Sequence, residues 1–215
     1  MTDHSRCGPD ELRKLNQQYP DRYPFLLQST AQGGDLGRFD ILFGFPGESL
    51  VLEESGQLSG RETGPHSGFL SALDKWWAEE RIADDGDDMP FNGCWFLYLG
   101  YELAAEVEPS LNLHNDPLLP TAFAVRCPVA IIYDHETGRS RFVSENEDEA
   151  IAAQLRTDIE GLDSVPGASH AKLQSVSEDD PLQFTDAVSE AKKHIEAGDV
   201  YQANLSRQWN VVVSN

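Results

Sequence analysis

The sequence predicts an α+β fold in which mixed, largely antiparallel sheets form a sandwich with helices on their faces. Two observations carry this prediction. Short apolar runs bounded by turn residues recur along the chain, and between them lie segments with one apolar face at helical spacing. The 215 residues, 40% of them apolar and 9% aromatic, have a globular composition and suffice for a sizeable buried core.

The first part of the chain predicts one helix followed by three strands. Residues 9–19 predict the helix, because a proline and early acids precede leucines at helical spacing. Apolar runs closed by polar or turn residues predict strands over residues 23–30, 38–45 and 49–55. Residues 54–66 are rich in glycine and polar side chains, so they predict a loop.

The middle of the chain predicts two helices with strands between them. Residues 69–83 repeat apolar residues at helical spacing, and residues 146–162 carry acids where the first turn of a helix favours them. Residues 94–103 are a dense aromatic and aliphatic run, which predicts a central strand covered on both faces. Residues 121–144 predict two strands joined by an Asp-His-Glu-Thr-Gly turn.

A change of composition marks a domain boundary. Residues 163–180 are rich in serine, glycine and acids and predict a linker, so we expect a first domain over residues 1–162. Residues 181–215 then begin a second domain, which is incomplete. We expect Asp180 to cap its helix and Gly198 to end that helix in a left-handed conformation.

After this helix the sequence predicts a strand from Val200 to Val213, which contains both polar and apolar residues. One helix and one strand cannot bury both of their faces, so this segment needs the first domain or a body that the chain lacks. Its apolar edge would otherwise be exposed.

Charge and composition exclude several classes of partner. Lys and Arg number 16 against 37 Asp and Glu, a formal net charge of −21, which repels nucleic acid and anionic membranes. An anionic metabolite would need a metal ion or local basic groups to reverse this field. The three cysteines give no disulfide framework or zinc spacing, and no apolar run reaches the roughly 18 to 20 residues of a membrane span. With no signal-peptide core at the N-terminus, the sequence predicts a cytoplasmic protein.

Several stretches, in order along the chain, resemble one family. "IEAGDVYQANLSRQW" at residues 195–209 is similar to the opening of the chorismate-binding domain of the anthranilate synthase and aminodeoxychorismate synthase component I family. "FLLQST" followed by "RFDIL" nine residues after its serine, "PFNGCWFLYLGYELAAEVEP" and "LLPTAFAVRCPVAIIYDH" resemble segments of that family's N-terminal domain. Cys94 departs from the family pattern, where a second glycine is usual. The resemblance implies an anthranilate synthase component I-like fold.

Two segments favour one branch of the family. Tyr201 to Leu205 and Arg38 to Asp40 look more like aminodeoxychorismate synthase component I, which aminates chorismate to 4-amino-4-deoxychorismate for 4-aminobenzoate and folate synthesis. Anthranilate synthase component I, which serves tryptophan synthesis, remains the alternative. A third possibility is a non-catalytic amino-acid-binding or regulatory module.

The resemblance also implies partners and a cofactor. Chorismate would be the substrate, a glutaminase subunit would supply ammonia, and Mg²⁺ held by glutamates would pair with the substrate carboxylate. The family motifs with the nucleophilic lysine and the metal ligands fall after Asn215, so we expect no catalytic residue and no metal site in this chain. We therefore expect an N-terminal fragment that is inactive alone. The acids Glu102, Glu106 and Glu108 suggest a metal cluster, but we expect structural or surface roles for them.

Two sets of site residues follow from the matched positions. The first is an amino-acid pocket, which in relatives binds tryptophan: Ser29, Leu36, Gly37, Arg38 and Phe39. Serine and backbone groups can bind the charged ends of an amino acid, and apolar walls can take an indole. The alternative is that Ser29 ends a strand and Arg38 pairs with Asp40 or another acid.

The second set is the substrate-domain signature: Tyr201, Gln202, Asn204, Ser206 and Arg207. Because strand side chains alternate, Gln202, Asn204 and Ser206 share one face of the predicted strand. This polar face could line the substrate cavity. The alternative is that these side chains bond neighbouring backbone and that Arg207 pairs with an acidic neighbour. His114 and His135 lie in predicted loops, where we expect surface histidines.

Overall fold

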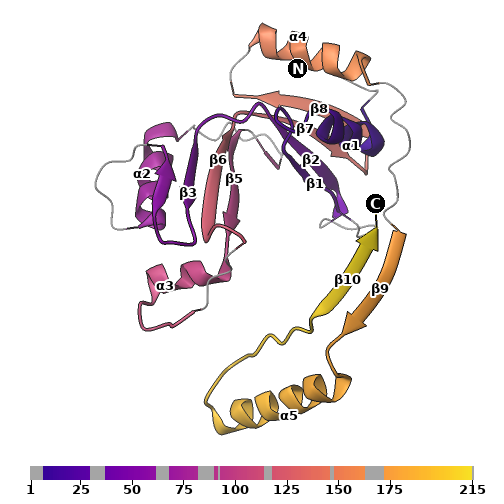
Figure 1. The fold of residues 1–215 in the computed structure, drawn as a ribbon. Helices are drawn as coiled ribbons and strands as arrows, with labels where there is room; N and C mark the ends of the chain where they lie inside the picture. The colour runs from indigo at the N-terminus through magenta and orange to yellow at the C-terminus, as the bar shows by residue number, and fades with distance from the viewer. Residues whose placement is uncertain are drawn as a thin grey trace. The chain divides into compact units, whose positions relative to one another are not determined.

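The computed structural model describes residues 7–29, 37–61, 68–81, 90–91, 93–113, 118–145, 148–162 and 172–214 (Figure 1). The chain divides into two compact units, Met1–Asp163 and Ser164–Asn215. Within the described ranges, no helix has the length and apolar character needed to cross a membrane.

Unit 1 contains two antiparallel sheets of four strands each (Figure 1). The first sheet has the order β1 (Phe25–Leu27), β2 (Phe39–Gly44), β7 (Val129–Asp134), β8 (Arg139–Ser144). The second sheet has the order β4 (Leu58–Gly60), β3 (Ser49–Leu52), β6 (Ala122–Cys127), β5 (Cys94–Leu99). The predicted α+β fold with largely antiparallel sheets is confirmed.

The chain changes sheets at two short connections. It leaves the first sheet after β2, where Phe45 takes a positive φ of 54°, and enters the second sheet at β3. It returns at Pro128, between β6 and β7. The sequence predicted one strand here, and this was wrong because proline cannot donate a ladder hydrogen bond, so the run divides into two strands in different sheets.

Helices cover the outer faces of both sheets. Leu12 and Leu15 of α1 (Pro9–Gln18) and Leu155 of α4 (Glu149–Glu160) pack with Leu42 of the first sheet. On the second sheet, α2 (Phe69–Glu80) buries Phe69, Ala72 and Trp76. The inner faces share a third cluster, in which the rings of Phe25 on β1 and Phe96 on β5 stack with centroids 4.0 Å apart. The layers are therefore helix, sheet, sheet and helix.

Two local predictions for the second sheet were wrong. The predicted loop at residues 54–66 contains strand β4. The apolar run at residues 94–103 forms β5, which lies at the edge of its sheet with Leu97 44% and Leu99 52% exposed, followed by the short helices η2 (Tyr101–Leu103) and α3 (Ala104–Val107). An apolar run alone does not distinguish a central strand from an edge strand, since that depends on neighbours far away in the sequence.

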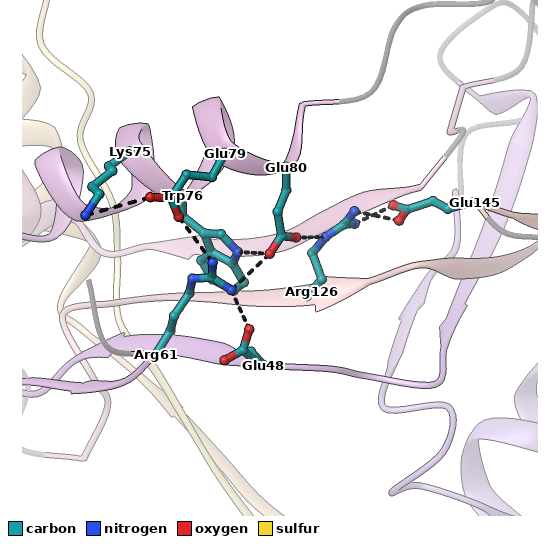
Figure 2. Close-up of polar contacts among 8 residues, drawn as sticks. All are labelled: Glu48, Arg61, Lys75, Trp76, Glu79, Glu80, Arg126 and Glu145. Carbon is teal, nitrogen blue, oxygen red and sulfur yellow. Dashed lines mark hydrogen bonds and ion pairs between the residues drawn. The ribbon is translucent and has the colours of Figure 1, made fainter. Parts of the chain in front are cut away.

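A network of ion pairs joins the two sheets to α2 (Figure 2). Arg126 of β6 pairs with Glu145, which follows β8 of the other sheet. Its Nε also donates to Glu80 of α2 at 2.7 Å, and its guanidinium lies 4.4 Å from the centroid of the Trp95 ring. Glu80 in turn accepts hydrogen bonds from Trp76 Nε1 at 2.8 Å and from Arg61 at 2.9 Å. This network fixes the layers on one side of the unit.

Unit 2 consists of an antiparallel strand pair, β9 (Lys172–Glu178) and β10 (Trp209–Ser214), with helix α5 (Pro181–Ala197) between them in sequence. The helix has the predicted ends: Asp180 accepts a hydrogen bond from the backbone N–H of Leu182 at 2.9 Å, and Gly198 has φ 80°. The predicted strand begins at Trp209 instead of Val200, and part of the predicted linker forms β9. Extended residues become a strand only where a partner lies beside them, and β9 reaches only the last part of the predicted strand.

Candidate functional site

Four of the five residues predicted for the amino-acid pocket lie at one end of the first sheet. Ser29 follows β1 by two residues, and Gly37 to Phe39 lead into β2. β1 pairs with β2 as far as Leu27 opposite Ile41, and beyond this pair the backbone N–H of Ser29 donates to Asp40 Oδ1 at 3.3 Å, so Ser29 lies beside the start of β2. The fifth residue, Leu36, lies outside the described residues. The convergence is a structural fact, while ligand binding there stays a prediction.

Arg38 is engaged by acidic side chains of the β7–β8 turn. Its Nη2 lies 2.9 Å from Asp134 Oδ2, its Nε lies 3.3 Å from Asp134 Oδ1 and 3.3 Å from Glu136 Oε2. Hydrogen bonding to Arg38 lowers the pKa of Asp134 from 3.8 to about 2. From the sequence, Asp40 or another acid could pair with Arg38. In the structure Arg38 pairs with Asp134 and Glu136. Its charge is already balanced, which makes it a poor sole binder for a ligand carboxylate.

Asp40 is a buried carboxylate at the same end of the sheet. Its side chain is 2% exposed. Oδ1 lies 2.9 Å from His135 Nε2 and accepts the backbone N–H of Ser29 at 3.3 Å, while Oδ2 accepts the side-chain amide of Gln28 at 3.1 Å. A buried charge is tolerated when hydrogen bonds of this kind replace its water.

Sequence reasoning did not assign Asp40 or His135 to a site. The available signal was an aspartate inside an otherwise uncharged strand, "FDILFG", because such a charge in a strand of a sandwich needs partners. His135 was expected at the surface. Its side chain is 38% exposed, but its Nε2 faces the buried Asp40. The partner lies 95 positions away in the sequence, so no local pattern shows it.

The two faces of β2 have different surroundings. Phe39, Ile41 and Phe43 pack in the cluster between the sheets. Leu42 packs on the opposite face, against the leucines of α1. Because strand side chains alternate, Asp40 shares the helix-covered face with Leu42, whereas Phe39 faces the other sheet.

The signature residues belong to unit 2, where Arg207 is half-buried and the other four are exposed. Tyr201 is 95% exposed, and Gln202 Nε2 donates to Asn204 Oδ1 at 3.1 Å. Ser206 is exposed as well. Arg207 pairs with Glu178 at the end of β9, and its guanidinium lies 5.3 Å from the centroid of the Trp209 ring. Within this unit, Glu178 is therefore the acidic neighbour of Arg207 that we expected if the signature has a structural role.

Two of the glutamates after β5, Glu106 and Glu108, form hydrogen bonds with nearby groups. Glu106 accepts the backbone N–H groups of Phe69 at 2.7 Å and Leu70 at 3.0 Å, so it caps the N-terminus of α2. Hydrogen bonds from Ser110 lower the pKa of Glu108. In the part of the chain that the structure describes, no three His, Cys, Asp or Glu side chains come together as a metal site would require. The described residues therefore show no cluster that would hold Mg²⁺ by protein side chains alone.

Comparison with known proteins identifies relatives of this chain. It is 28% identical over 222 residues to anthranilate synthase component 1 of Streptomyces coelicolor, covering 94% of this chain and 39% of that protein. It is 28% identical over 219 residues to anthranilate synthase component 1 of Saccharomyces cerevisiae, covering 92% of this chain and 41% of that protein. The chain thus spans about two-fifths of the length of these curated relatives.

The fold has a counterpart among solved structures. Anthranilate synthase component I from Streptococcus pneumoniae TIGR4 superposes with a TM-score of 0.51 at 19% identity, covering 80% of this chain and 41% of that chain. At this identity the likeness concerns the fold alone. A family described as chorismate binding enzyme matches residues 23–215, which include every strand of both units. The chain belongs to the chorismate binding enzyme family.

Proposed function

We propose that the polypeptide containing this chain aminates chorismate as anthranilate synthase component 1 does, with ammonia supplied by a glutaminase subunit. One observation carries the proposal: 94% of the chain aligns in order with anthranilate synthase component 1 of Streptomyces coelicolor. The sequence alone favoured aminodeoxychorismate synthase, and the relatives support the alternative better.

Aminodeoxychorismate synthase remains a second candidate because of one residue. Anthranilate synthases tend to carry a Gly-Arg-Tyr-Ser-type motif where this chain has Gly37 to Asp40. Asp40 is not an exposed residue that could vary freely. Its side chain is 2% exposed and forms hydrogen bonds with three donors. A serine in its place could not accept all three hydrogen bonds. The second candidate rests on the resemblance of the segment from Arg38 to Asp40 to aminodeoxychorismate synthase component I.

The charge of the substrate limits where the chemistry can take place. Chorismate is a dianion, and its hydroxyl is a poor leaving group, so the reaction needs a cation and a proton donor at the ring. The chain has a net charge of −21, and its described residues do not fit a metal site. Mg²⁺, together with a nucleophilic lysine in the aminodeoxychorismate branch, therefore enters the proposal only for the complete enzyme.

We further propose that the amino-acid pocket takes tryptophan. Support comes from the convergence of Ser29 with Gly37 and Phe39 at one end of the first sheet. The Phe39 side chain belongs to the aromatic cluster between the sheets, which supplies an apolar wall. Bound there, tryptophan would act as a feedback inhibitor or as a structural ligand.

Complementation separates the two enzymatic candidates. The complete polypeptide encoded by the gene is expressed in one strain that requires tryptophan because it lacks anthranilate synthase component 1, and in another that requires 4-aminobenzoate. An ammonium salt replaces the glutaminase subunit. If the first strain grows on medium without tryptophan, the result supports the proposal. If only the second strain is rescued, on medium without 4-aminobenzoate, the result supports the second candidate. If neither strain grows although the protein is folded and abundant, both enzymatic assignments fail.

A further inference from the structure

We propose that Asp40 and His135 are positioning residues of the amino-acid pocket, which hold the backbone of Ser29 in the geometry that binds the ligand. This inference rests on the proposed pocket. It adds two residues that neither the family motif nor the strand pattern assigns. Both would act on the ligand through Ser29 without contacting it.

The first step is the burial of the Asp40 carboxylate. An ionised carboxylate with 2% exposure is stable only when donors replace its lost water. Its donors come from two segments: Gln28 and Ser29 after β1, and His135 in the turn after β7. Because losing a donor leaves part of the charge unsatisfied, the carboxylate holds the two segments in one arrangement.

The second step is the orientation of His135. A carboxylate can only accept, so the imidazole donates from Nε2 across the 2.9 Å contact with Asp40. The backbone N–H of His135 also donates to the carbonyl oxygen of Arg38 at 2.8 Å. The imidazole and the Tyr133 ring are nearly perpendicular, with centroids 4.9 Å apart. Backbone and side chain together fix the turn against the start of β2.

The remaining charges around this turn form a separate group. Arg38 pairs with Asp134 and Glu136, which flank His135 in the sequence. Arg38 therefore binds the turn through Asp134, and Asp40 binds it through His135. Both charged residues at the start of β2 thus contact the turn after β7. The turn, which the sequence indicated only as a hairpin connection, thereby controls the segment that carries the predicted pocket residues.

The location of the Asp40 side chain favours a positioning role over direct contact with the ligand. Its side chain lies on the helix-covered face of β2, whereas Phe39 faces the cluster between the sheets. Among the described residues, Asp40 reaches the predicted pocket through the hydrogen bond that its Oδ1 accepts from the backbone N–H of Ser29 at 3.3 Å. We therefore expect Asp40 to act on binding through the Ser29 backbone.

Calorimetry with L-tryptophan tests the effect on binding in the complete polypeptide. We expect His135→Ala to weaken binding about tenfold, the equivalent of one hydrogen bond to a charged group. We expect His135→Gln to stay within about threefold of the parent, because its amide can donate from near the Nε2 position. The matched control is His194→Ala, since His194 Nδ1 also lies 2.9 Å from an aspartate, Asp199, but in unit 2. Parent-like binding by His135→Ala would overturn the inference.

Amide hydrogen exchange at Ser29, measured by NMR, tests the positioning without any ligand. We expect exchange about tenfold faster in His135→Ala than in the parent, and parent-like exchange in His135→Gln. Unchanged exchange in His135→Ala would overturn the inference even if the affinity fell. If the parent itself binds no L-tryptophan, the proposed pocket fails, and the Ser29 exchange rate alone then decides whether Asp40 and His135 position this segment.

Discussion

Tyr23 and Asp158, 135 positions apart in the sequence, are joined by a 2.7 Å hydrogen bond in which the tyrosine hydroxyl donates to the carboxylate. Burial, reinforced by the bond to Asp158, raises the pKa of Tyr23. Arg22 Nη1 donates to the same carboxylate at 2.7 Å, and Gln154 Nε2 donates at 2.9 Å. The group ties α4 to the segment after α1, which completes the helical layer over the first sheet.

Replacing Asp158 should therefore destabilise unit 1. We expect Asp158→Ala to lower the free energy of unfolding by about 2 to 3 kcal/mol, below the usual cost for a fully buried pair because Arg22 is 35% exposed. Tyr23→Phe, which removes one donor, should cost about 1 kcal/mol. Urea denaturation measures both. The control Asp10→Ala breaks a surface pair with Arg13 and should cost less than about 0.5 kcal/mol. Equal losses for Asp158→Ala and Asp10→Ala would contradict this account.

The pair between Arg126 and Glu145 should stabilise the contact between the sheets. Their side chains are 12% and 8% exposed, so Glu145→Gln, which removes the charge and keeps the shape, should lower the free energy of unfolding by about 1 to 2 kcal/mol. Urea denaturation followed by tryptophan fluorescence measures the loss, because the guanidinium lies on the Trp95 ring. Glu79→Gln is the control, because the exposed side chain of Glu79 pairs with Arg61 at 3.2 Å, and it should change stability by less than about 0.5 kcal/mol. The idea fails if the two variants lose the same amount.

Asp134 should contribute an acid-sensitive part of the stability. Arg38 lowers its pKa from 3.8 to about 2 in the folded protein, so the folded state favours the ionised carboxylate. This stabilisation is complete above about pH 5 and is lost as the pH falls through about 2. Asp134→Asn should therefore be less stable than the parent at about pH 6 and approach it at about pH 2. Free energies of unfolding across this range check the expectation, and a difference that does not vary with pH would rule it out.

Cys7 should be chemically inert while the protein is folded. Burial, with a further contribution from Glu11, raises the pKa of its thiol from 9.0 to about 12. At about pH 8 roughly one molecule in ten thousand then carries the reactive thiolate. We expect peptide mapping after brief iodoacetamide treatment to find Cys7 unmodified in the native protein and modified in urea. Rapid native labelling of Cys7 would show that the segment before α1 is not packed as described.

Local signals in the sequence were sufficient for the longer helices α1, α2, α4 and α5, but not for η2 and α3. The proline and acids before Leu12, the cap at Asp180 and the left-handed Gly198 all predict helix ends from residues a few positions away. The structure has helices at those places, since helical hydrogen bonds and caps join residues close in sequence. The family resemblance was also available from the ordered motifs, and the match over residues 23–215 confirms it.

Strand assignments were weaker because pairing involves distant residues. β9 consists of seven exposed residues and has no apolar pattern that distinguishes it from a linker. It is a strand only because residues 209–214 pair with it. In the same way, the interruption at Pro128 was visible in the sequence, but the assignment of β6 and β7 to different sheets was not.

For the predicted pocket, the sequence selected the residues at one end of the first sheet but not what holds them there. Ser29, Gly37, Arg38 and Phe39 follow from the motif. The Asp40–His135 contact does not, because only folding brings Asp40 on β2 beside His135 in the turn after β7.

The amino-acid sequence by itself determined the family of this protein, its α+β class and the ends of its main helices. Only the tertiary structure decided which sheet each strand joins, that β5 is an edge strand, and that the carboxylate of Asp40 is buried beside His135. The physical reason is the range of the interactions. Helix periodicity and capping depend on neighbours within a turn, whereas strand pairing and the burial of a charge depend on partners tens of residues away.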